Sequence, residues 1–166
     1  MKHFKTYLLI ITLITALFTS QAQMAHINSE MLVQAMPETI AMSEELKRIG
    51  QDYDTDYKSQ ATELQVKAQK YQEEAQGKTK EINERRIQEI EELKQKLQLY
   101  LRSAQEELQK KEYQLLRPII DKAKKAIEDV AAEKSIKYVF DSSPGKGLIV
   151  MEGEDLMSAV KAKLGL

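Results

Sequence analysis

The feature that most constrains this fold is a long segment, from Glu38 to Ser135, that contains very few helix-breaking residues. Alanine, glutamate, glutamine, lysine and leucine dominate it, and these are strong helix formers. Its apolar residues recur every three or four positions, so they form one stripe on a helix that is otherwise charged. The stripe consists of Leu46, Ile49, Tyr53, Tyr57, Ala61, Leu64, Ala68, Tyr71, Ala75, Ile90, Leu93, Leu97, Leu101, Ala104, Leu108, Leu115, Ile119, Ala123, Ile127 and Val130. Sustained over this length, the pattern is typical of a coiled coil.

A glycine near the middle of this segment indicates that the helix folds back on itself. Gly77 is followed by a polar stretch, residues 78–86, which suits the tip of an antiparallel helical hairpin. Pro37 suits the first turn of the first arm, where its missing N–H is not needed. Pro118 removes a hydrogen bond from the second arm, and we expect it to kink the helix where that arm ends. The alternative is a straight parallel coiled coil in which Gly77 is merely tolerated.

The two ends of the chain favour the hairpin because they contain the pieces of one small β-structure. We expect strands at Met24–Asn28, Ile136–Asp141 and Gly147–Met151, the last two joined by a turn-rich connection. A short helix is expected over Asp155–Leu164. A hairpin brings the first strand back beside the others, whereas a straight rod separates them.

The predicted fold class is therefore α+β and mostly α. A small β-body, with three short strands per subunit and a C-terminal helix, is expected from residues 23–36 and 119–166. A long antiparallel helical-hairpin tentacle is expected from residues 37–118, with its tip near residues 77–86. Three short strands leave exposed edges and too small a core, so we expect the subunits to associate.

The first 22 residues have the pattern of a cleaved secretory signal. Lys2 and Lys5 are followed by an uncharged apolar run, Tyr7–Phe18, and then by small residues at Ser20 and Ala22. An uncleaved membrane anchor is the alternative, but this run is much shorter than the roughly 20 residues that span a bilayer. We expect cleavage after Ala22 and export to the periplasm.

No pattern in the remaining chain indicates an enzyme, a cofactor or a metal site. Cysteine is absent, and His26 is the one histidine after residue 22. Pro144–Gly147 lacks the spacing of a phosphate-binding loop and is interpreted as a turn. The signal contains two of the 25 basic residues and none of the 26 acidic ones, which leaves 23 against 26. That near-neutral balance does not favour nucleic-acid binding.

The order of these features resembles the Skp/OmpH family of periplasmic chaperones. The resemblance rests on four short sequence motifs: Ala25–Glu30 (AHINSE), Met36–Glu38 (MPE), Leu116–Lys122 (LRPIIDK) and Tyr138–Ser143 (YVFDSS). The resemblance implies a homotrimer in which strands of three subunits form the body and three tentacles enclose a cavity. It also implies unfolded outer-membrane β-barrel proteins as clients.

The predicted tip differs from the basic tip that the resemblance implies. Residues 78–96 contain six basic side chains, Lys78, Lys80, Arg85, Arg86, Lys94 and Lys96, against five acidic ones, Glu81, Glu84, Glu89, Glu91 and Glu92. This balance does not favour lipid or lipopolysaccharide contact.

The leading functional hypothesis is an ATP-independent holdase that binds unfolded outer-membrane proteins and prevents their aggregation. The expected client-binding residues are apolar positions of the arms: Tyr57, Leu64, Tyr71, Leu93, Leu97 and Tyr100. The alternative is a structural coiled-coil spacer of the cell envelope without client activity. A seam diluted with alanine and tyrosine favours the holdase, because a spacer should have a tightly packed Leu/Ile seam.

Overall fold

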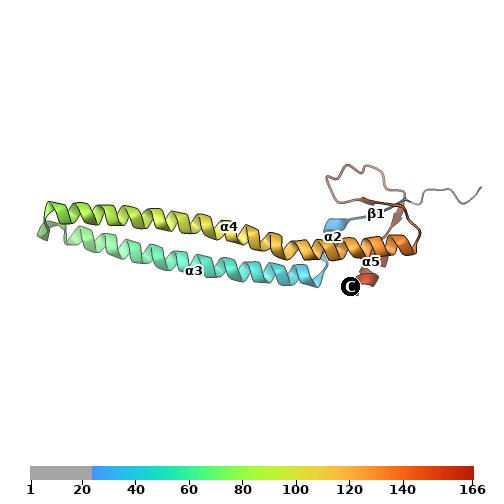
Figure 1. The fold of residues 1–166 in the computed structure, drawn as a ribbon, viewed down its shortest axis with the longest axis horizontal. Coiled ribbons are helices and arrows are strands. Elements are labelled where there is room, and N and C mark those ends of the chain that lie inside the picture. The colour runs from blue at the N-terminus through green and yellow to red at the C-terminus, as the bar shows by residue number, and fades with distance from the viewer. Residues whose placement is uncertain (1–23) are drawn as a thin grey trace, which may run out of the picture. The chain divides into compact units, whose positions relative to one another are not determined.

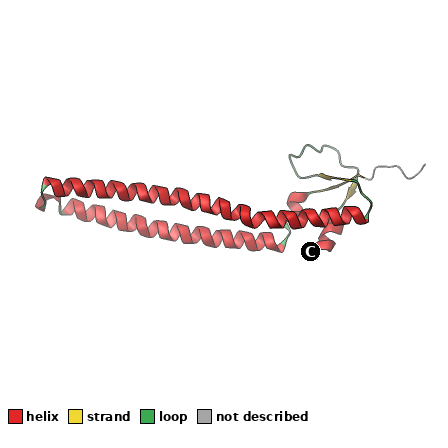
Figure 2. Cartoon of the chain, viewed as in Figure 1, coloured by secondary structure: helices red, strands yellow, loops and turns green. Residues whose placement is uncertain are grey.

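The computed structural model describes residues 24–166, so the predicted signal peptide lies outside the described part of the chain. In chain order the elements are β1 (Met24–Ile27), α2 (Ser29–Gln34), α3 (Pro37–Glu73), the 3-10 turn η2 (Ala75–Gly77), α4 (Lys80–Glu133), β2 (Tyr138–Asp141), β3 (Glu154–Asp155) and α5 (Met157–Leu164). Helices dominate (Figure 2). The predicted class, mostly helical with a small three-stranded sheet and a long helical hairpin, is confirmed.

The described chain forms two compact units. Residues 37–119 form one unit, which we call the hairpin, and residues 24–36 with 120–166 form the other, which we call the body. Helix α4 contributes to both and runs through Pro118. None of the helices in residues 24–166 has an apolar stretch long enough to cross a membrane.

In the hairpin, α3 and α4 lie side by side and run in opposite directions (Figure 1). Pro37 occupies the first position of α3, as its fixed φ and missing N–H allow. The chain reverses between Glu74 and Thr79, so residues 80–86, which belong to the expected tip, are already helical. The Asn83 side chain closes this turn, because its Nδ2 donates to the carbonyl oxygen of Ala75 at 3.0 Å.

The body contains a parallel sheet with strand order β2-β1-β3. Met24 pairs with Tyr138 in β2, and Ala25 pairs with Glu154 in β3. The prediction of a strand at Gly147–Met151 is wrong: that segment has no regular structure, and the third strand is Glu154–Asp155.

A close backbone approach explains why the third strand begins where it does. A Cβ atom at Gly153 would lie 3.0 Å from the carbonyl oxygen of Met24, so a larger residue would have to push this carbonyl back by a few tenths of an ångström. Glycine thus favours the close approach of the chain to β1 just before the third strand.

The body core lies between the sheet and the helices. Strand β1 alternates, so Ala25 and Ile27 are buried while Met24 and His26 lie on the other face. The other buried apolar residues of the body are Leu32, Met36, Ala123, Ala126, Val130, Ala131, Ile136, Leu156 and Val160. Helix α4 ends in a Schellman-type turn in which Ser135 has a φ of 57° and the Ile136 N–H donates to the carbonyl oxygen of Ala131 at 2.8 Å.

Candidate functional site

Most of the seam between the two arms of the hairpin is only half-buried, although Ala104 of α4 is buried. Helix α3 has no fully buried residue, because two helices alone cannot enclose the side chains between them. The predicted client-binding residues all lie at this seam with intermediate exposure: Tyr57, Leu64, Tyr71, Leu93, Leu97 and Tyr100. Each therefore contributes to holding the arms together and keeps part of its surface in contact with solvent.

Aromatic contacts hold the middle of the seam. The rings of Tyr53 and Tyr100 meet edge to face, with centroids 6.1 Å apart and planes at 72°. The Tyr100 hydroxyl donates to Oδ2 of Asp56 at 3.4 Å. Partial burial, together with the Asp56 carboxylate, raises the pKa of Tyr100 above its ordinary value. Tyr100 therefore joins the arms as a neutral hydrogen-bond donor.

A polar cluster joins the arms near the tip. The Tyr71 hydroxyl donates to Oε2 of Glu89 at 2.7 Å, and Lys67 pairs with the other oxygen of the same carboxylate. The guanidinium of Arg86 lies over the Tyr71 ring, 4.3 Å from its centroid, and pairs with Glu74 at 2.6 Å. The hydrogen bond to Glu89 raises the pKa of Tyr71, whereas the hydrogen bond from Lys67 lowers the pKa of Glu89. The Tyr71 hydroxyl and one face of its ring are thus in contact with α4.

Two hollows open along the seam. The one nearer the tip has a volume of about 370 Å³ and is lined by Ala68, Tyr71, Gln72, Ala75, Asn83, Arg86, Ile87, Ile90 and Glu91. The second has a volume of about 240 Å³ and is lined by Gln60, Glu63, Leu64, Lys67, Leu93, Lys96 and Leu97. Four of the six predicted residues line one of these hollows, namely Tyr71 in the first and Leu64, Leu93 and Leu97 in the second.

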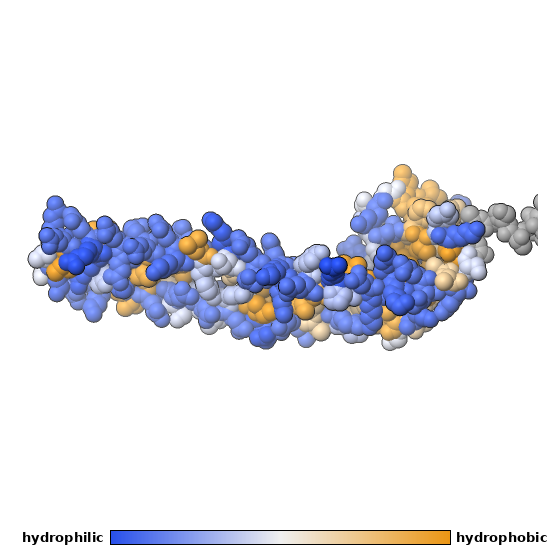
Figure 3. Space-filling model, in the orientation of Figure 1, coloured by the Kyte–Doolittle hydropathy of each residue, from blue (hydrophilic) through white to orange (hydrophobic). Residues whose placement is uncertain are grey.

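Several exposed apolar residues of the arms were missed by the sequence reasoning. Ile87, Val66 and Leu99 are 64%, 62% and 56% exposed. Hydrophobic side chains appear along the arms as separate patches among hydrophilic ones (Figure 3). For Ile87 there was a signal: it precedes the stripe residue Leu101 by 14 residues, which is two heptads, so the two share a helix face.

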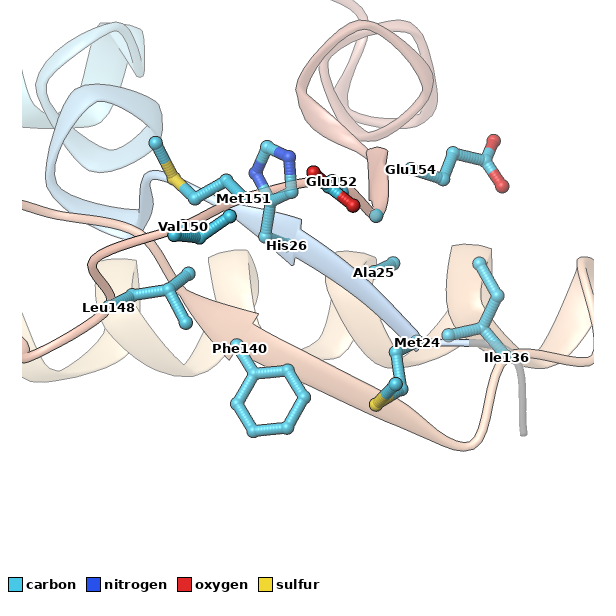
Figure 4. A pocket seen from close by; sticks show the side chains of 11 residues that line it. Met24, Ala25, His26, Ile136, Phe140, Leu148, Val150, Met151, Glu152 and Glu154 are labelled. Carbon is cyan, nitrogen blue, oxygen red and sulfur yellow. The ribbon is translucent and has the colours of Figure 1, made fainter. Parts of the chain in front are cut away.

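The body exposes one apolar face of its sheet. Met24 and His26 of β1 lie opposite Tyr138 and Phe140 of β2 on this face. The loop after β2 adds Leu148, Val150 and Met151. With Met24, His26 and Phe140, but not Tyr138, these side chains line a hollow of about 560 Å³ that also has Glu152 and Glu154 in its lining (Figure 4). Ile149 is 92% exposed. The outer edges of β2 and β3 have no strand partner in the described chain.

Ser29, Asp141 and Ser143, which belong to the sequence motifs shared with the family, form a hydrogen-bonded cluster that we call the clasp. Asp141, at the end of β2, accepts hydrogen bonds from the backbone N–H groups of Ser29 and Ser143 at 3.2 and 3.0 Å. Their hydroxyls donate to the same carboxylate at 2.7 and 2.6 Å. Burial by itself raises the pKa of Asp141, but these four hydrogen bonds outweigh it and lower the pKa to about 2. The clasp ties the start of α2 to the end of β2.

The arrangement offers surfaces for non-covalent contact. In residues 24–166 there is no cluster of three or more His, Cys, Asp or Glu side chains that could hold a metal ion. His26 is half-buried on the apolar face of the sheet, and its buried Nδ1 has no hydrogen-bond partner among residues 24–166.

Comparison with known proteins connects these surfaces to a family. Residues 23–164 match the family model described as outer membrane protein (OmpH-like). A solved structure from Caulobacter crescentus, assigned as an OmpH-like outer membrane chaperone, superposes with a TM-score of 0.76 and 16% identity, covering 87% of this chain and 85% of that one. A search of curated proteins found no match.

Proposed function

Because the chain belongs to the OmpH-like family of outer membrane chaperones, whose members are not enzymes, we propose that it is an ATP-independent holdase of the periplasm. It binds unfolded outer-membrane β-barrel proteins and prevents their aggregation. Without a nucleotide site, release is driven by the larger free-energy gain of the client when it folds into the membrane.

The observation that carries this proposal is the half-buried seam of the hairpin. Its apolar residues pack against the opposite arm but remain partly exposed, and hollows interrupt the packing. An unfolded chain can contact many such weak positions at once, and many weak contacts at high effective concentration hold tightly. Tyr57, Leu64, Tyr71, Leu93, Leu97 and Tyr100 are the client-contacting residues in this proposal.

The active form in this proposal is a homotrimer assembled through the body. The exposed sheet face carries Phe140 and Tyr138, and the neighbouring loop carries Ile149 and Val150 at high exposure. Exposed apolar area of this kind, beside open strand edges, is typical of an interface. Association through the body leaves the three hairpins free to surround a client.

Light scattering tests the proposal. An outer-membrane β-barrel protein unfolded in urea is diluted into buffer with and without the protein lacking residues 1–22. Holdase activity predicts suppression that saturates near one client per three chains. Unchanged aggregation in the presence of folded protein would refute the holdase proposal and favour the alternative hypothesis of a structural spacer.

A further inference from the structure

A histidine lies at the centre of the apolar sheet face of the body. His26 is on β1, the middle strand, and its Cα partners are Phe140 in β2 and Asp155 in β3. Its imidazole lies among the apolar side chains that line the hollow of about 560 Å³ (Figure 4). Histidine is the side-chain type whose charge changes between pH 5 and 8, and His26 is the one histidine after residue 22. This face therefore contains a group of the kind that responds to mild acid.

The surroundings of the imidazole suit its neutral form. Nδ1 is buried and has no hydrogen-bond partner among residues 24–166. In the neutral ring one nitrogen is an acceptor, whereas in the charged ring both nitrogens carry a proton and donate. A buried N–H without an acceptor costs free energy, and a buried charge without a partner costs more. Protonation of His26 would therefore leave an unpaired donor at Nδ1.

The carboxylates near the imidazole do not supply that acceptor. The titratable groups on this face or in the lining of its hollow are Tyr138 of β2, Glu152 of the loop, and Glu154 and Asp155 of β3. Glu154 pairs with Lys134 at 2.6 Å, and Oδ1 of Asp155 accepts from the backbone N–H of Met157 at 2.8 Å. A phenol such as that of Tyr138 is ordinarily uncharged in this pH range. No carboxylate of the described chain thus accepts a hydrogen bond from Nδ1.

Association through the body would remove water from this hollow. The face carries exposed apolar side chains beside open strand edges, and the homotrimer proposed above covers it. A neutral ring can be covered together with Phe140 and Met24, whereas a charged ring would lose its hydration. The separate subunit would then bind a proton more readily than the associated one. By linkage, association must weaken as the pH falls.

We propose that His26 makes association through the body sensitive to pH: the neutral imidazole permits it, and the protonated imidazole opposes it. This inference rests on the proposed homotrimer and adds a regulation of its assembly by mild acid. The clasp separates this effect from unfolding, because the pKa of Asp141 is about 2. At pH 5.5 the clasp is still charged, so the body should remain folded while its association weakens.

Analytical ultracentrifugation of the full mature chain, over a range of concentrations at pH 8 and pH 5.5, tests the proposal. The wild type should need about tenfold or more protein to associate at pH 5.5 than at pH 8. His26→Gln and His26→Phe are uncharged at both pH values, so they should associate equally at both. Circular dichroism checks that each protein stays folded.

A matched control moves the histidine to the other unit. Val66 is 62% exposed on α3, in the hairpin. The double variant His26→Gln with Val66→His has as many histidines as the wild type but none on the sheet face. It should associate equally at both pH values. Weaker association of this variant at pH 5.5 would contradict the role given to the position of His26.

The imidazole also gives a readout that needs no variant. The mature chain has one histidine, so its ring gives one NMR signal to follow. This signal should report protonation at a lower pH in concentrated, associated protein than in dilute protein. Titration at the same pH in both samples would contradict the linkage.

Two results of the ultracentrifugation would overturn the inference. One is wild-type association that does not change between the two pH values. The other is a pH dependence that persists in both His26→Gln and His26→Phe, which would assign it to another group, such as the amino terminus of the mature chain. A wild type that does not associate at pH 8 would overturn the proposed homotrimer and this inference together. The light-scattering experiment would then decide separately on holdase activity.

Discussion

Replacing Asp141 with asparagine should loosen the body in a way that depends on pH. The carboxylate accepts four hydrogen bonds, from the backbone and the hydroxyl of both Ser29 and Ser143. Asparagine keeps the shape, but it has one acceptor oxygen, and its NH₂ group would face N–H and O–H donors. The four bonds cannot all be kept.

The pKa of Asp141 sets the size of the effect. Its value falls from an ordinary 3.8 to about 2 in the folded protein. Each unit corresponds to about 1.4 kcal/mol, so the charged form adds at most roughly 2–3 kcal/mol to the free energy of unfolding, less what solvent screens at this partly exposed group. Because the folded pKa is the lower one, this stability is fully present above pH 4. It is lost as the pH falls from about 4 toward 2.

Urea unfolding at fixed protein concentration measures this difference. The amide NMR signals of Ala25 and Val139, which pair between β1 and β2, report on the body alone. At pH 7 the variant Asp141→Asn should unfold with a free energy lower by about 1–2 kcal/mol. Near pH 2 the difference should be much smaller, because the wild-type carboxyl is then about half protonated in the folded protein and almost fully protonated in the unfolded one. A gap of the same size at both pH values would refute the role given to the charge.

Three glycine-related changes give further predictions. Gly153→Ala should destabilise the body by about 1–3 kcal/mol, because its Cβ would press on the Met24 carbonyl oxygen at 3.0 Å; an unchanged urea midpoint for the body signals would contradict this. Ser135→Gly should stabilise the same unit by about 1 kcal/mol, since Ser135 holds a φ of 57° that glycine adopts without strain; a lower urea midpoint would be the opposing result. Gly50→Ala should stabilise the hairpin by about 1 kcal/mol, because it lies inside α3 and its new Cβ would meet Leu108 at an ordinary 4.0 Å. Thermal unfolding followed by circular dichroism checks it, and a lower melting temperature would show that the site cannot accept a methyl group.

The hairpin could be predicted from the sequence because its signals are local. The apolar stripe, the proline at the start of α3 and the break at Gly77 each act within a few residues of the chain. Helix formation and reversal follow from such patterns.

The third strand could not be predicted because its position depends on residues far apart in the chain. Gly147–Met151 has the β-branched and apolar composition of a strand, but the place beside β1 is taken by the acidic pair Glu154–Asp155. No propensity favours these two residues as a strand. The pairing comes with a close approach of Gly153 to Met24, and that contact is visible only in three dimensions.

The candidate site was predicted in part for the same reason. Periodicity identified seam residues such as Leu93 and Leu97, since both belong to the apolar stripe. It could not show that Lys67 and Tyr71 both reach Glu89 across the seam, or that hollows open beside these contacts. These features depend on the register between two antiparallel helices, which the spacing within each helix does not contain.

The most direct test of the holdase proposal is to detect the complex between this protein and an unfolded client. Analytical ultracentrifugation of the mature chain, mixed with an outer-membrane β-barrel protein diluted from urea, separates free chaperone, complex and aggregate. A trimeric holdase should give a soluble species containing three chains and one client, formed without nucleotide. Free chaperone sedimenting apart from aggregated client would contradict it.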